Sequence, residues 1–178
     1  MPGNAILYRD DIDSPLGPMI AGASSQGLCF LEWHDRGGTE QILKRVEKRY
    51  RLPLEEGEHP VVNQLTVELA RYFDGLGSSF TVPLHIAGTP FEVSVWQQLL
   101  RIPYGETRSY GDIARELGKP GASRAVGRAN GANYLSIVIP CHRVCDSNGK
   151  LHGYGGGLWR KQRLLELEAG VVQTLAGV

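Results

Sequence analysis

The residues with the clearest chemical potential are Cys141 and the histidine that follows it. Residues 136–139 are β-branched and apolar, so we expect a buried strand there, and Pro140 cannot continue it as a central strand. Cys141 is therefore predicted to lie where the chain leaves the core, beside the polar His142. A nucleophilic cysteine must be ionised, and a nearby imidazole is a suitable base. The plainer alternative is a small buried hydrophobic side chain, because most free cysteines are of that kind.

A carboxylate that could orient this histidine lies in the last predicted helix, residues 158–168. Glu168 follows Leu164 and Leu165 by four and three residues, so it shares their apolar face. It also lies in the final helical turn, where the helix dipole disfavours negative charge. An anion in two unfavourable places indicates a specific partner such as an imidazole, and the alternative is a solvated terminal glutamate.

The other cysteines, Cys29 and Cys145, have no such neighbours and are predicted to be structural. Three cysteines without paired spacing do not form a disulfide framework. The Cys141-His142 and Cys145 group offers too few ligands for a closed zinc site. The glycine-rich residues 153–157 lack the lysine and hydroxyl ending of a phosphate loop. We therefore expect no metal and no cofactor.

A helix-turn-helix is predicted in the second half of the chain. Ser109 and Asp112 form the capping-box pattern of a short helix. A Gly/Pro turn follows at residues 118–121, and a second short helix covers about residues 122–130. Two short helices joined by a tight turn are typical of this motif.

The second of these helices divides by face. One apolar face, expected to point to the core, has the spacing i, i+3, i+4, i+7 and consists of Ala122, Ala125, Val126 and Ala129. Arg124 and Arg128 lie one turn apart on another face, with Gly127 beside them. A cationic face with little bulk could approach a duplex backbone closely, although arginine pairs are also common on solvated surfaces.

Charge is distributed unevenly along the chain. The net charge is zero, but residues 1–89 hold 8 basic and 12 acidic side chains, whereas residues 90–178 hold 11 and 7. Phosphate contacts are therefore expected in the C-terminal half. No apolar run approaches the roughly 18 residues of a membrane span. The N-terminal stretch reaches three aspartates by Asp13 without a secretory pattern, so we expect a cytoplasmic protein with no membrane partner.

The first half is predicted to be a small α/β scaffold. Strands are expected at residues 5–12, 19–23 and 27–33, helices at 41–50 and 60–73, and a crossing segment at 80–86. The fold class is therefore α/β, with a small N-terminal α/β domain containing a short antiparallel sheet over residues 1–86. A mainly helical C-terminal domain with the helix-turn-helix follows over residues 87–178, and it opens with a helix capped by Thr89 and Glu92.

Together these motifs resemble the O6-alkylguanine-DNA alkyltransferases, from about Thr89 to Gly170, roughly half of the chain. The resemblance is carried by Phe91…Val95-Trp96, Ile102-Pro103-Tyr104-Gly105-Glu106-Thr107, Ser109-Tyr110-Gly111, Arg124-Ala125-Val126-Gly127, Ile139-Pro140-Cys141-His142-Arg143-Val144, Gly153-Tyr154-Gly155-Gly156-Gly157 and Leu164-Leu165-Glu166-Leu167-Glu168.

The resemblance implies DNA repair by direct, stoichiometric and irreversible transfer of the alkyl group of O6-alkylguanine, and of O4-alkylthymine, to Cys141. His142, through a water and with Glu168 behind it, would help to form the thiolate. Asn133 would brace the active-site turn. Tyr110 would crowd the backbone phosphate and donate a hydrogen bond toward the guanine ring.

The implied partner is double-stranded DNA with alkylated bases, bound by a monomer; cooperativity on DNA and the range of adducts are left open. Arg124 would fill the gap left by the flipped nucleotide. The other implied DNA contacts are Tyr110, Ala125, Gly127 and Arg128. Backbone groups of Cys141, Val144 and Gly155, with Tyr154 beside them, would hold the flipped base.

The sequence departs from the family pattern at Tyr134, where a proline usually follows the asparagine, and at Gly131, where some relatives have a basic residue. The zinc-binding cysteines of some relatives are missing. Two other interpretations remain. A non-catalytic alkyltransferase-like lesion sensor would have another residue in place of Cys141. A cysteine hydrolase would turn over many times and would need no helix of the Arg124 type.

Overall fold

The computed structural model describes residues 5–77 and 79–176, which form two compact units. The first comprises the described residues up to Ala87 together with residues 174–176, and the second is Gly88–Gln173. The domain ranges expected from the sequence, 1–86 and 87–178, place the C-terminal tail in the second half. In the structure the Leu175 N–H of this tail donates to the Phe73 carbonyl of the first unit (2.7 Å). The first residues of the N-terminal stretch, 1–4, lie outside the described residues. Among the helices described, none has the length and apolar character needed to cross a bilayer.

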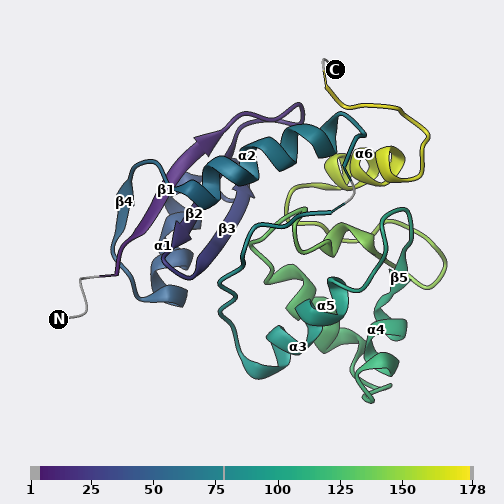
Figure 1. Ribbon diagram of the computed structural model, residues 1–178. Coiled ribbons are helices and arrows are strands. Elements are labelled where there is room, and N and C mark those ends of the chain that lie inside the picture. The colour runs from purple at the N-terminus through teal and green to yellow at the C-terminus, as the bar shows by residue number, and fades with distance from the viewer. Residues whose placement is uncertain (1–4, 78, 177–178) are drawn as a thin grey trace. The chain divides into compact units, whose positions relative to one another are not determined.

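The first unit is built on a mixed four-stranded sheet with the order β3-β2-β1-β4 (Figure 1). The three predicted strands are present and pair antiparallel with one another: β1 (Leu7–Ile12), β2 (Met19–Ser24) and β3 (Gly27–Trp33). The fourth strand, β4 (Leu54–Glu56), pairs parallel to β1 and was not predicted. The sheet is therefore mixed rather than wholly antiparallel.

Two helices, α1 (Thr39–Tyr50) and α2 (Pro60–Phe73), pack against this sheet. Every residue of β2 and β3 is buried, which is typical of strands covered on both faces. The predicted crossing segment, residues 80–86, lies along the free edge of β3, where Leu28 N–H donates to the Pro83 carbonyl and His85 N–H to the Leu28 carbonyl, both at 2.8 Å. The edge strand is thus protected from further pairing.

The second unit is mainly helical, and the predicted α/β class with a helical C-terminal part is confirmed (Figure 1). Its elements are α3 (Pro90–Leu99), β5 (Arg108–Ser109), α4 (Tyr110–Glu116), α5 (Ser123–Gly131), the 3₁₀ turn η1 (Cys141–Arg143), β6 (Val144–Cys145) and α6 (Leu158–Glu168). Helix α5 packs against both α3 and α4. The Trp96 indole N–H, which donates to the Ala129 carbonyl (2.8 Å), fixes α3 to α5.

Local sequence explains where these helices begin and end. Both predicted capping boxes are formed, by Thr89 with Glu92 and by Ser109 with Asp112. Helix α4 ends at Glu116, and Gly118, two residues later, has a φ of 71°, in the left-handed region that glycine adopts without steric cost. The short turn that follows allows α4 and α5 to pack together as the predicted helix-turn-helix.

Candidate active site

The chain leading to Cys141 is a buried turn, and the strand predicted at residues 136–139 is absent. Ile137 has a φ of 71°, which is incompatible with an extended strand. The Ile139 N–H donates to the Leu135 carbonyl (2.9 Å), which closes a tight turn. The apolar side chains are buried as expected. Their β-branched pattern therefore indicated burial correctly, but it did not indicate the backbone conformation.

Asn133 holds this turn in place. Its amide Nδ2 donates to the Ile139 carbonyl (2.9 Å), and its Oδ1 accepts from the Leu135 N–H (2.9 Å). The bracing role implied for Asn133 matches this geometry. The predicted departure at Tyr134 leaves both hydrogen bonds intact, because the Tyr134 backbone takes part in neither.

Cys141 begins the 3₁₀ turn η1 and is 5 % exposed. Its carbonyl accepts a long hydrogen bond (3.4 Å) from the Nδ2 of Asn130, a buried residue of α5. This contact ties the cysteine to the helix that carries the two arginines. Sequence reasoning missed Asn130, although it stands directly after Ala129 of the apolar face.

His142 and Glu168 form a buried pair. His142 Nε2 lies 2.6 Å from Glu168 Oε2, and both side chains are almost wholly shielded from solvent. The apolar face shared with Leu164 therefore does place the α6 carboxylate in the interior. The other ring nitrogen, His142 Nδ1, has no hydrogen-bond partner among the described residues.

Arg143 completes this cluster, and the sequence analysis assigned it no role. Its Nε donates to Glu168 Oε1 (2.6 Å), and its Nη1 donates to the Ile102 carbonyl (2.8 Å). Its guanidinium lies over the Tyr104 ring, 5.8 Å from the ring centroid. Each oxygen of Glu168 thus has its own partner. A buried carboxylate in a C-terminal helical turn needs a cation as partner. The position of Glu168 in the sequence therefore indicated a cationic side chain in addition to the imidazole.

The charge states of the cluster follow from these contacts. Burial by itself raises the pKa of Glu168, but His142 and Arg143 outweigh it and lower the pKa to about 2. Burial lowers the pKa of His142, and Arg143 and Lys161 add to this effect while Glu168 opposes it. Because arginine is always protonated, Glu168 is ionised whether or not His142 is charged. Neutral His142 therefore holds its proton on Nε2, and Nδ1 is the basic atom.

Lys161 is a second buried cation that the sequence analysis missed. Its side chain is fully buried, and Nζ donates to the carbonyls of Val144, His152 (3.1 Å) and Gly153 (3.4 Å). Burial lowers the pKa of Lys161, and the nearby thiols of Cys145 and Cys141 oppose this shift. The signal was present, because Lys161 precedes Leu164 and Glu168 by three and seven residues and so shares their inward face.

Tyr110 connects the helix-turn-helix to the cysteine. The parallel pair of β5 and β6 aligns Ser109 with Cys145, which brings the first residue of α4 close to η1. The Tyr110 hydroxyl donates to the His152 carbonyl (3.1 Å), and its pKa is raised by burial and further by Asp146 and the two thiols. A Cβ on Gly127 would lie 3.8 Å from the Tyr110 ring, so α5 passes close to it.

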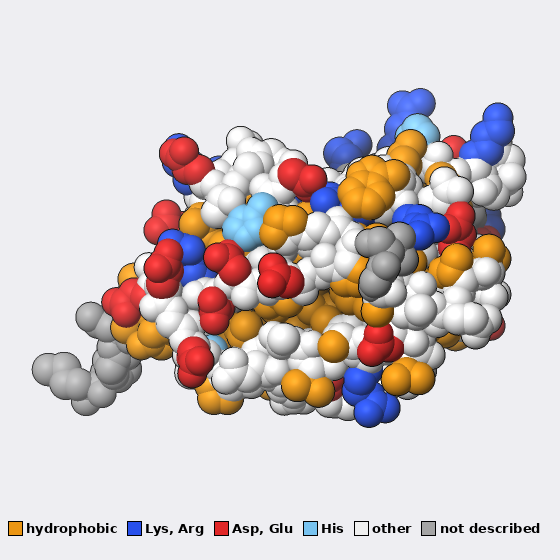
Figure 2. Space-filling view, turned by 90° about the horizontal axis from the view of Figure 1, so that it is seen from above, with side chains coloured by type: hydrophobic (Ala, Val, Ile, Leu, Met, Phe, Trp, Pro, Cys, Tyr) orange, Lys and Arg blue, Asp and Glu red, His pale blue; other side chains and the backbone are white. Residues whose placement is uncertain are grey.

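Helix α5 presents the predicted basic face. Arg124 and Arg128 are exposed, Ala125 and Gly127 are half-buried, and Val126 faces the core. Figure 2 shows most of the visible Lys and Arg side chains on the second unit and most Asp and Glu side chains on the first. This separation follows the charge asymmetry of the sequence.

The residues implied in base binding are close in sequence to the carbonyls that Lys161 bonds, those of Val144, His152 and Gly153. Val144 is buried, and its carbonyl already accepts from Lys161. Tyr154 is half-buried and Gly155 is exposed. Gly157, with a φ of 91°, ends this loop as the N-cap of α6. The loop is therefore anchored at both ends, with Gly155 accessible between them.

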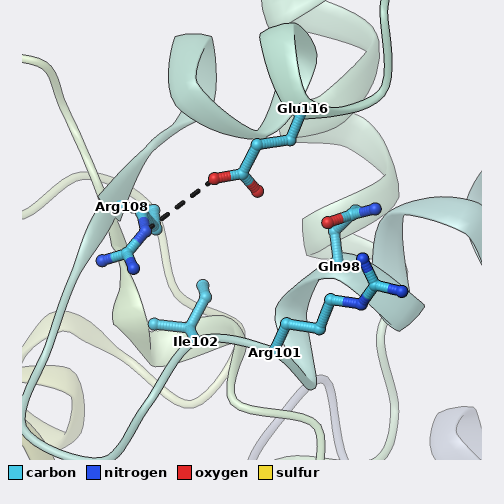
Figure 3. A pocket seen from close by; sticks show the side chains of 5 residues that line it. All are labelled: Gln98, Arg101, Ile102, Arg108 and Glu116. Atoms are coloured by element: carbon cyan, nitrogen blue, oxygen red, sulfur yellow. Dashed lines mark ion pairs between the residues drawn. The ribbon is translucent and has the colours of Figure 1, made fainter.

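A cavity of about 310 Å³ lies apart from these residues (Figure 3). It is lined by Gln98, Arg101, Ile102, Arg108 and Glu116. Arg108 pairs with Glu106 (3.0 Å) and Glu116 (3.9 Å), which balances its charge. Ile102 links this cavity to the cluster, since its carbonyl accepts from Arg143.

Comparison with known proteins covers both units. Residues 7–86 match the ribonuclease-like domain of 6-O-methylguanine DNA methyltransferase, and residues 90–170 match its DNA-binding domain. A methylated-DNA–protein-cysteine methyltransferase of Mycolicibacterium paratuberculosis is 52% identical over 166 residues, 92% of each chain. That of Mycobacterium leprae is 44% identical over 172 residues, 95% of this chain and 96% of the relative.

Solved structures agree. The crystal structure of Mycobacterium tuberculosis OGT in complex with DNA superimposes with a TM-score of 0.78 at 42% identity, covering 92% of this chain and 93% of that one. The O6-methylguanine-DNA methyltransferase of Pyrococcus kodakaraensis gives a TM-score of 0.67 at 28% identity, with 91% and 98% covered. The chain therefore belongs to the methylated-DNA–protein-cysteine methyltransferase family.

Proposed function

We propose that this protein repairs duplex DNA by transferring the alkyl group of O6-alkylguanine, and also of O4-alkylthymine, directly to its own Cys141. The observation that supports this assignment is the buried hydrogen bond between His142 Nε2 and Glu168 (2.6 Å). That bond leaves a basic Nδ1 on the residue next to the cysteine. A sensor without catalysis would need neither the cysteine nor this pair.

The first step is formation of the thiolate. His142 Nδ1 accepts the thiol proton of Cys141 through a water molecule, because adjacent side chains diverge and the two groups need not touch. Glu168 then faces an imidazolium, and the ion pair stabilises the charge that has formed. The Lys161 ammonium, which interacts electrostatically with the Cys141 thiol, favours the thiolate in the same way.

The second step is an in-line displacement. The Cys141 sulfur bonds to the alkyl carbon while the bond from that carbon to guanine O6 breaks, and its electron pair stays on O6. The Tyr110 hydroxyl turns away from the His152 carbonyl and donates its proton to the base. The proton held by His142 then restores the Tyr110 hydroxyl. Overall the thiol proton takes the place of the alkyl group. The thioether has no route back to the thiol, so each molecule acts once.

DNA binding is assigned to α5 and the start of α4. Arg124 and Arg128 supply positive charge, and the small Ala125 and Gly127 permit close approach to the backbone. The target atom is stacked inside the duplex, so the base must be extruded at a cost of a few kcal/mol. Arg124 fills the space that it leaves. Val144, Tyr154 and Gly155 hold the base, and Asn133 keeps the turn before Cys141 in place.

The partner in this proposal is alkylated duplex DNA bound by a monomer. The location proposed for the protein is the cytoplasm. No metal or cofactor takes part in any step.

A labelled duplex tests the assignment. The protein is mixed with DNA containing O6-methylguanine with an isotopically labelled methyl group, and the peptides containing Cys141, Cys145 and Cys29 are weighed by mass spectrometry. We expect the label on the Cys141 peptide alone. Label that remains on the DNA, or that reaches another cysteine, would contradict the proposal.

Matched variants separate transfer from binding. Cys141→Ser should bind the duplex but accept no label, whereas Cys145→Ser should accept it on Cys141. The same assay with O4-methylthymine tests the second substrate.

A further inference from the structure

Arg143 occupies an unusual place beside the proposed relay. It is buried, and its guanidinium bonds both a charged and a neutral acceptor, Glu168 Oε1 (2.6 Å) and the Ile102 carbonyl (2.8 Å). Both of these hydrogen bonds go to oxygen acceptors other than the imidazole. Its influence on His142 therefore passes through Glu168 and through its charge.

Without Arg143, the negative charge of Glu168 would have to be compensated by His142. An ionised carboxylate in the interior requires a positive partner. If the only neighbour were His142, that partner would be an imidazolium, and Nδ1 would hold a proton already. With Arg143 in place, the carboxylate is compensated while the imidazole stays neutral.

We propose that Arg143 is a positioning residue for alkyl transfer. It balances the charge of Glu168, so that before the reaction His142 is a neutral imidazole with its proton on Nε2 and a free Nδ1. This inference rests on the proposed function, because it assumes that His142 accepts the Cys141 proton. It assigns to Arg143 a role distinct from folding alone.

The other charged and titratable groups around His142 do not replace Arg143. Lys161 lowers the pKa of His142 as well, but its ammonium donates to three backbone carbonyls and not to the Glu168 carboxylate. The Tyr104 ring lies against Arg143, and burial raises the pKa of its hydroxyl, so it stays neutral. The Cys141 thiol is the group that delivers the proton.

The sign of the effect follows from electrostatics. Removing a buried positive charge makes both His142 and the nearby thiol hold their protons more tightly. The acidic limb of the rate profile should therefore move to higher pH when Arg143 becomes neutral. An arginine beside a carboxylate typically changes a pKa by one to three units, so a shift of about one pH unit is expected.

The test is the pH dependence of alkyl transfer for Arg143→Gln and Arg143→Lys, with Tyr104→Phe as the matched control. Arg143→Gln should move the midpoint up by about one unit and lose about tenfold in rate at neutral pH. Arg143→Lys keeps the charge and should restore the midpoint, and Tyr104→Phe should not move it. A slower Arg143→Gln with an unchanged midpoint would overturn the proposal, because lost packing alone lowers the amplitude.

The pathway through Glu168 is tested with the double variant. In a Glu168→Gln background, adding Arg143→Gln should move the midpoint far less than it does in the wild type. An equal shift in both backgrounds would show that Arg143 acts independently of Glu168, against the proposal.

Two measurements separate this inference from the proposed function. Reaction of the Cys141 thiol with iodoacetamide reports its ionisation without DNA, and the same midpoint shifts are expected there even if methyl transfer fails. Nitrogen-15 NMR of wild-type His142 needs no variant to fold. It should show a neutral ring protonated on Nε2 at pH 7, and an imidazolium at that pH would overturn the proposal.

Discussion

Each of the two units contains a cysteine beside a histidine, and the two sites differ in the charge around them. In the first unit, Cys29 Sγ lies 3.7 Å from His85 Nδ1, and Ser24 Oγ lies 2.7 Å from the same nitrogen. These partners of His85 are neutral groups, whereas His142 bonds a carboxylate. Burial raises the pKa of Cys29 to about 11, so this thiol stays protonated.

In the second unit, the residues around Cys141 include three buried charges, Arg143, Lys161 and Glu168. The carboxylate orients the imidazole, and the two cations offset the cost of negative charge in the interior. The comparison teaches that proximity of a thiol and an imidazole is not sufficient for a nucleophile. Charged groups must also be placed to stabilise the thiolate and the imidazolium that forms with it.

The largest expected difference between the sites is in the cysteines themselves. Cys141→Ser should lower alkyl transfer by about 10³-fold or more, because a serine hydroxyl is not ionised by this cluster. Cys29→Ser should leave the rate within about twofold of wild type. Single-turnover transfer from O6-methylguanine DNA measures both. A comparable loss in the two variants would remove the distinction.

The next largest effect is expected from the partners of the two histidines. Glu168→Gln removes the charge that orients His142 and should slow transfer by about 10²-fold. It also leaves Arg143 buried without its anion, at a cost of about 3 kcal/mol in the free energy of unfolding. Urea unfolding and transfer rates measure the two effects. His85→Gln in the first unit is the control, and it should leave the rate unchanged.

The two sites should also respond to opposite extremes of pH. Glu168 has a lower pKa when folded, so its stabilisation, about 3 kcal/mol, is present above pH 4.5 and is lost as the pH falls toward 2. His142, whose pKa burial also lowers, favours the unfolded chain as the pH falls through 6.5. Cys29 has a raised pKa, so its contribution is lost as the pH rises from 9 toward 11.

Tryptophan fluorescence can follow the two units separately. Trp33 is buried in the first unit and Trp96 in the second, whereas Trp159 is 55 % exposed. Variants that keep only Trp33 or only Trp96 should show the second unit losing stability in acid and the first in base. His85, whose pKa is also lowered by burial, adds a smaller acid sensitivity to the first unit. The reverse order would contradict the assigned charge states.

A smaller effect is expected from Lys161→Met, which removes one of the two cations but leaves Arg143 and Glu168 paired. The rate at neutral pH should fall by less than about tenfold, with the acidic limb shifted upward by less than one unit. Rate profiles over pH measure this shift. A rate equal to wild type would show that Lys161 serves only to bond the carbonyls of Val144, His152 and Gly153.

Much of this arrangement could be predicted from local sequence. The capping boxes at Thr89 and Ser109 depend on residues three positions apart, and both were confirmed. The inward position of Glu168 followed from helical periodicity. Strand β4 was not predicted because three residues are too few for a recognisable pattern. The segment is extended because it pairs with β1, which is distant in sequence.

The errors near the site have physical causes. The apolar residues before Cys141 were read as a strand because both strands and buried turns favour such side chains, and the positive φ of Ile137 leaves no mark in composition. Arg143 and Lys161 were missed because basic residues are usually exposed. Their burial depends on Glu168 and on loop carbonyls, which only the folded chain brings together.

The central claim is that Cys141, and no other thiol, is alkylated once and permanently. The most direct measurement adds a tenfold excess of duplex containing labelled O6-methylguanine and counts transferred methyl groups per protein molecule by intact mass. The account predicts a limit of one methyl group per chain, located on Cys141, with Cys29 unmodified. Continued turnover beyond one, or label divided between the two cysteines, would contradict it.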